Sequence, residues 1–121
     1  MARIPLPPDE RAARMRRGRE AFCAGDFYAA HELWEEAWNA TDDGPARLHV
    51  QGLIQLATAL YKLGRGRPDL CARLVAKALE RLRGAPDIVD GVDVAAARRG
   101  AETLGDALAR GESVDGRAVR C

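Results

Sequence analysis

The chain has 121 residues, a length that fits one domain with a modest hydrophobic core. Its 19 basic and 18 acidic residues leave a net charge of +1, too balanced to indicate a nucleic-acid or acidic-membrane partner. No apolar run approaches the roughly 20 residues that a membrane-spanning helix needs, so we expect a soluble, cytoplasmic protein.

The first segment contains three prolines, Pro5, Pro7 and Pro8. They predict an extended leader over residues 1–8, because proline restricts the residue before it to extended conformations. A first helix is predicted from residue 9 to about 24, where Gly25 ends it. Five arginines crowd this helix: Arg11, Arg14, Arg16, Arg17 and Arg19. No aromatic residue lies among them, which favours a solvated helix face, partly paired with Glu10 and Glu20, over RNA binding.

Four further helices are predicted from their capping residues, at about 27–40, 45–63, 68–83 and 94–110. Asp26 and Asp93 are good N-caps, because a side-chain carboxylate accepts the free N–H groups of a first helical turn. Pro45 and Pro68 suit the first turn, where no N–H donor is needed. We expect a loop over residues 84–91 between the last two helices. Residues 9–111 are therefore predicted to form a single helical domain, and residues 112–121 a frayed tail.

This pattern contains no strand signal and predicts an all-α bundle of about five helices in antiparallel hairpins. Residues 25–38 can be laid over residues 66–79, a faint repeat that makes the fold loosely tetratricopeptide-like. Ala72 and Ala76 then stand where the first copy has His31 and Glu35. The scaffold would accept small apolar residues there, so the His/Glu pair would be an addition to the fold.

The second helix holds the best candidate site. His31 and Glu35 lie one turn apart and border an apolar stripe that contains Trp34 and Trp38. Glu32 and Glu36 project to the other side and are predicted to be solvated. On the third helix, a row of polar residues interrupts an otherwise apolar surface: Gln51, Gln55, Thr58 and Lys62.

A buried polar group without a partner costs about 1–3 kcal/mol, so the polar row of the third helix needs hydrogen-bonding partners. We expect it to face the His31/Glu35 edge and to form a semi-buried polar site between the second and third helices. The predicted ligand-binding residues are His31, Glu35, Trp34, Trp38, Gln51, Gln55 and Lys62.

Two motifs resemble a bacterial family called domain of unknown function 309. They are Ala-His-Glu-Leu-Trp-Glu-Glu-Ala-Trp at 30–38 and Gln-Gly-Leu-Ile-Gln-Leu-Ala at 51–57, and the resemblance extends over about residues 18–100 to Gly-Val-Asp at 91–93. It implies a small all-helical fold and no established activity. The chain departs from the family at Lys62, where a histidine is frequent, and at Gly66-Arg67, where Gly-Asn is frequent.

We favour a non-catalytic domain that binds a small molecule or a protein, and a homodimer is left open. One alternative is a metal-dependent or histidine-based hydrolase that uses His31 and Glu35, in a His-Glu-x-x-Glu motif. These two residues are the only metal ligands the sequence suggests, whereas catalytic zinc takes three from the protein. The only serine, Ser113, lies in the predicted tail, and neither a catalytic residue nor a cofactor is predicted. Another alternative is a structural polar network in a protein-interaction module.

Three cysteines lie at no metal-ligand or redox spacing: Cys23, Cys71 and Cys121. We expect free thiols, with Cys23 and Cys71 as small core residues.

Overall fold

The computed structural model describes residues 6–116 and residue 119. Over these residues the chain forms five helices and a two-stranded hairpin. The helices are α1 (Pro8–Cys23), α2 (Phe27–Asn39), α3 (Pro45–Gly64), α4 (Pro68–Leu82) and α5 (Val94–Ala109). The all-α prediction is therefore confirmed.

The helix ends form where the capping residues predict them. The Asp26 carboxylate accepts the Ala29 N–H at 3.1 Å, and the Asp93 carboxylate accepts the Ala96 N–H at 2.9 Å. Three helices begin at a proline, since its missing N–H would have no partner in the first turn in any case. One of these prolines is Pro8, which opens α1 inside the predicted leader.

The predicted loop over 84–91 instead includes the first strand of a short hairpin. Strand β1 (Ile88–Val89) pairs antiparallel with β2 (Val92–Asp93). The turn residues Asp90 and Gly91 have φ angles of 49° and 83°, the left-handed conformation that a tight hairpin turn requires at both central positions. The Asp-Gly pair is the sequence signal for this turn. Arg11 on α1 forms an ion pair with Asp90 at 2.8 Å and so joins the hairpin to the first helix.

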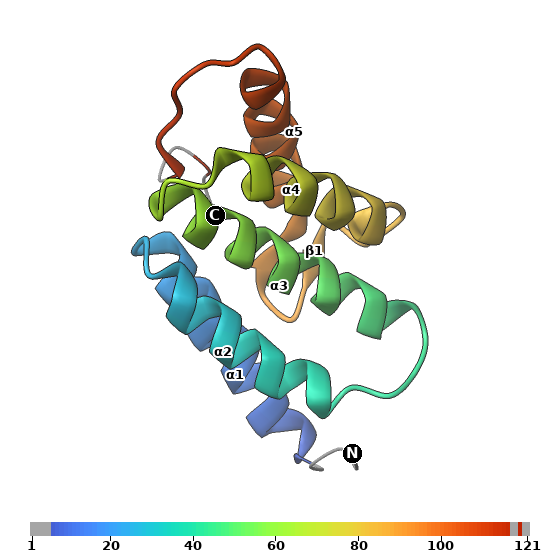
Figure 1. The fold of residues 1–121 in the computed structure, drawn as a ribbon. Coiled ribbons are helices and arrows are strands. Elements are labelled where there is room, and N and C mark those ends of the chain that lie inside the picture. Colours follow the sequence, from blue (N-terminus) through green and yellow to red (C-terminus); the bar gives the residue numbers. More distant parts are fainter. Residues whose placement is uncertain (1–5, 117–118, 120–121) are drawn as a thin grey trace.

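The helices pack as two antiparallel hairpins and a final helix (Figure 1). Helix α3 lies between α2 and α4, so α2, α3 and α4 run side by side as one layer. Helix α1 packs on α2, and α5 crosses behind α4 at a steep angle. Within the described residues, no helix is long and apolar enough to cross a membrane.

Trp34 is the largest fully buried side chain and lies where α1 and α2 meet. Its indole Nε1 donates a hydrogen bond to the Met15 carbonyl at 3.1 Å, and its ring lies 5.5 Å from that of Phe22. Gly18 leaves room for the indole, because a Cβ there would lie only 2.4 Å from two of its ring atoms.

The cysteines differ from one another. Cys71 is buried and free, as expected, and burial raises the pKa of its thiol to about 11. The prediction for Cys23 is wrong, because this residue is exposed at the end of α1 and disulfide-bonded. The preceding residue, Phe22, occupies the α1–α2 contact instead, with its ring 5.5 Å from that of Trp34. Cys121 lies outside the described residues.

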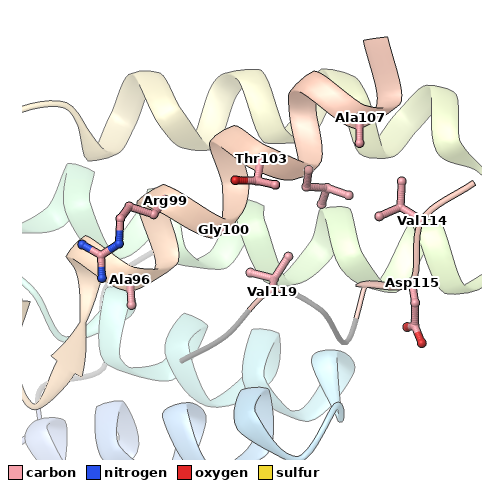
Figure 2. A pocket seen from close by; sticks show the side chains of 9 residues that line it. Ala96, Arg99, Gly100, Thr103, Ala107, Val114, Asp115 and Val119 are labelled. Carbon is pink, nitrogen blue, oxygen red and sulfur yellow. The ribbon is translucent and has the colours of Figure 1, made fainter. Parts of the chain in front are cut away.

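The tail from residue 112, expected to be frayed, returns to the helices at the residues that the structure describes. Val114 packs against the core, and Val119 is buried beside Gly100 of α5. Together with α5 these two valines line a hollow of about 310 Å³, with Arg99 and Asp115 also in its wall (Figure 2).

Candidate functional site

His31 lies between two carboxylates of its own helix. Its Nε2 is 3.1 Å from Glu35, one turn further along α2, and its Nδ1 is 3.2 Å from Glu32. A protonated imidazole donates to both carboxylates, whereas a neutral imidazole has one N–H and donates to only one. The side chain of His31 is 27% exposed and that of Glu35 is 49% exposed, so the pair lies at the surface.

The two glutamates predicted to be solvated are exposed but paired. Glu32 contacts His31, and Glu36 accepts a hydrogen bond from Arg14 of α1 at 2.9 Å. The prediction treated α2 as isolated, so it missed both the adjacent imidazole and the arginine that α1 brings alongside. Consequently, one edge of α2 faces α1 through Glu36 and the other edge carries His31 and Glu35.

The two tryptophans of the predicted site have different environments. Trp34 points toward α1 and belongs to the core. Trp38 is covered by the Arg47 guanidinium, which lies 3.6 Å from the ring centroid. Arg47 also donates to the Trp38 and Thr41 carbonyls at 2.9 and 2.8 Å. These contacts fix the turn from α2 to α3.

The polar row of α3 is half-buried on the outer side of the helix. The fully buried residues Val50, Leu53 and Leu60 occupy the opposite side. Thr58 satisfies its hydroxyl within the helix by donating to the Ile54 carbonyl at 2.9 Å. Over the described part of the chain, no hydrogen bond or ion pair joins His31 or Glu35 to this row. The convergence of His31 with Gln51 and Gln55 on one pocket stays a prediction.

Two tyrosines that sequence reasoning missed complete the neighbourhood of His31. The Tyr28 ring lies 6.2 Å from the His31 ring and 5.6 Å from the ring of Tyr61 on α3. Lys62 Nζ and the Arg65 guanidinium lie 6.0 and 5.9 Å from the Tyr61 centroid. Tyr28 precedes His31 by three residues, the spacing at which two side chains share a helix face, and this spacing was the available signal.

The neighbouring hollow is open to solvent. It has a volume of about 850 Å³, and its walls include Asp26, Tyr28, Tyr61 and Arg65. A small internal cavity lined by Trp34 and Leu53 measures only about 10 Å³. A space of this size holds about one water molecule, so it is too small for a ligand.

Three side chains of the site could serve as metal ligands. His31, Glu32 and Glu35 each place a ligand atom within 4.8 Å of the other two. One ion takes one imidazole nitrogen, whereas the two carboxylates lie at opposite nitrogens of the ring. Coordination by all three groups would therefore require the side chains to rearrange.

Replacement of His31 by alanine should change the free energy of unfolding by less than about 1 kcal/mol, because exposed ion pairs contribute little to stability. Urea unfolding followed by circular dichroism would measure the change, with Glu36→Ala as a matched control on the other edge of α2. A loss of several kcal/mol would instead favour the structural-network hypothesis.

Comparison with known proteins supports the resemblance drawn from the two motifs. A model of the family described as domain of unknown function (DUF309) matches residues 15–74, which include both motifs. An uncharacterized protein of Aquifex aeolicus (strain VF5) is 32% identical over 83 residues, 69% of this chain and 25% of that protein. The chain thus spans about a quarter of this relative's length. No solved structure matches significantly. Through residues 15–74, the chain belongs to the domain of unknown function 309 family.

Proposed function

We propose that this chain is a non-catalytic protein-binding domain whose contact surface is the α2–α3 edge. We define this edge by Tyr28, His31, Glu35, Tyr61 and Lys62. The observation that carries the proposal is the ring of Tyr28, which is 55% exposed although it lies against His31 and Tyr61. Cytoplasmic location remains a prediction from composition.

Tyrosine side chains are enriched in protein interfaces because they combine a large apolar ring with a polar hydroxyl. Tyr28 is held by two neighbouring rings, so binding would immobilise it at a small cost in side-chain entropy. Lys62 on α3, Arg65 directly after α3 and Glu35 on α2 surround the tyrosines with charges of both signs. An apolar centre with a charged rim is the usual composition of a protein interface.

Small-molecule binding and catalysis have less support from the same geometry. Small ligands are usually held in concave sites that bury most of their surface, whereas the hollow beside Tyr28 is open. Both ring nitrogens of His31 contact carboxylates, which leaves neither nitrogen uncommitted as a general base.

Metal binding has one specific observation in its favour, the close grouping of His31, Glu32 and Glu35. Metal analysis of protein purified without a histidine tag would test it. Stoichiometric zinc, iron or manganese that disappears in His31→Ala would favour a metal site over the protein-binding surface.

The protein-binding proposal can be tested by photo-cross-linking in living cells. Tyr28 is replaced by benzoylphenylalanine, and the same substitution at Ile88 is the control, since Ile88 is 66% exposed on β1. We expect residue 28 to yield a discrete cross-linked product by mass spectrometry, and the product should weaken when Tyr61 is changed to alanine. The absence of any product specific to residue 28 would contradict the proposal.

A further inference from the structure

The layer formed by α2, α3 and α4 presents one continuous outer face (Figure 1). We call it the front face and define its centre by the polar row of α3. This row lies opposite the buried side of α3 and is continued by Leu48, which is 48% exposed. The front face therefore exposes the side of α3 that the two neighbouring helices leave uncovered.

On one side of this centre the front face is acidic. Glu32 and Glu35 on α2 are both about half exposed. They lie on the edge of α2 that turns toward α3, since Tyr28 on the same edge contacts Tyr61. Glu36, four residues after Glu32, lies nearer α1, where it pairs with Arg14.

On the other side of the centre the front face is basic. Arg73, Lys77 and Arg81 follow one another at steps of four residues and form one row along α4. The row meets α3 at Arg81, because a Cβ at Gly52 would lie 3.0 Å from the Arg81 Cβ. The acidic residue Glu80 follows Lys77 by three residues and lies in the wall of the groove toward α5.

The seam between α3 and the basic row also has unmet hydrogen-bonding capacity. Over the described residues, Gln55 Oε1 and Arg81 Nε are buried and have no hydrogen-bond partner. A buried polar atom without a partner is costly, so a side-chain movement that brings these atoms to the surface would let them bond to polar groups of a partner. Gln55 lies at the middle of α3, between the acidic and the basic rows.

We propose that a second copy of this chain binds the front face, around a twofold axis that runs along α3. Such an axis exchanges the two sides of the face, so the glutamates of each copy lie over the basic row of the other. A twofold axis perpendicular to α3 within the face would instead place the glutamates of one copy over the glutamates of the other. The glutamine side chains of the two α3 helices then meet at the axis. This inference rests on the proposed protein-binding function and names the partner.

The size and register of the face fit this pairing. The 20 residues of α3 span about 30 Å, and three helices at about 9–10 Å spacing span about 28 Å. The product is on the order of 800 Å², which is what each partner of a standard stable interface buries.

Tyr28 meets Tyr61 near one end of α3 and Trp38 meets Arg47 near the other, so the acidic row lies at mid-length. The basic row extends from Arg81, beside Gly52, along the same stretch.

Charge reversal tests the proposal. One variant carries Glu32→Lys and Glu35→Lys, and the other carries Arg73→Glu and Lys77→Glu. The matched controls are Glu20→Lys on α1 and Arg99→Glu on α5, both exposed and away from the front face. In sedimentation velocity we expect a wild-type dimer whose Kd rises at least about tenfold in each variant alone, because like charges then face each other. An equimolar mixture of the two variants should restore the dimer, and the controls should leave it unchanged.

The outcomes separate this inference from the proposed function. A wild-type protein that sediments as a monomer at every concentration, or a dimer that neither variant weakens, overturns the second copy as the partner. If cross-linking from residue 28 still captures a different protein, the protein-binding function stands with another partner. If residue 28 captures nothing, both fail. Circular dichroism of each variant confirms that a lost dimer does not reflect a lost fold.

Discussion

Replacement of Trp34 by alanine is expected to lower the free energy of unfolding by about 3–5 kcal/mol. The indole is 1% exposed and contacts the ring of Phe22, so its removal leaves a large cavity between α1 and α2. It also removes the hydrogen bond to the Met15 carbonyl. Because a domain of this size has a total stability of only about 5–15 kcal/mol, the variant should lose a large fraction of its stability. Urea unfolding followed by circular dichroism would measure the loss.

Trp34→Phe separates the two contributions. Phenylalanine keeps an aromatic ring in the site and loses the N–H donor, so the Met15 carbonyl loses its side-chain partner. We expect a loss of about 1–3 kcal/mol, smaller than that of Trp34→Ala. Equal losses in the two variants would show that ring volume contributes little, which would contradict the close packing of the indole against Phe22.

Replacement of Gly18 by alanine should cost about 3 kcal/mol, at the upper end of the range for overpacked cores. The new methyl group would lie 2.4 Å from the Trp34 ring, and a buried indole cannot move as the end of a flexible side chain can. The control is Gly64→Ala, also in a helix, where a Cβ would meet nothing within 4 Å. Alanine has the higher helix propensity, so this control should leave stability unchanged or raise it by up to about 1 kcal/mol.

A double-mutant cycle links these two predictions. If the methyl group at position 18 acts through the indole, Gly18→Ala should cost less in a Trp34→Phe background than in the wild type. The difference should be about 0.5–3 kcal/mol, the usual range for residues in direct contact. Additive losses would mean that the strain at Gly18 arises elsewhere.

The local parts of the fold were predictable from the sequence. Asp26, Asp93, Pro45 and Pro68 act within one helical turn, and each marks a helix start where the capping rules place it. The hairpin was missed, since strands of two residues are too short for the alternating pattern that identifies a strand. Its Asp-Gly turn was the only local evidence.

The candidate site was also predictable only in its local contacts. The contact between His31 and Glu35 follows from their spacing along α2, and it forms. Contacts between helices depend on how each helix rotates about its axis, which one helix alone does not determine. The hydrogen bond from Trp34 to the Met15 carbonyl, 19 positions earlier in the chain, was therefore not predictable from the sequence of α2. The contact between Tyr28 and Tyr61 on α3 could not be predicted for the same reason.

The ion pair between Arg11 and Asp90 connects the first helix to a part of the chain beyond the family match. The family match ends at residue 74, yet Asp90 and both strands of the hairpin lie beyond it. Val92 and Ala97 line the same small cavity as Trp34 and close it from the far side. A polypeptide cut at the ends of the match would expose this apolar surface to water. We therefore expect the autonomous folding unit to be longer than the matched residues 15–74 and to include the hairpin and α5.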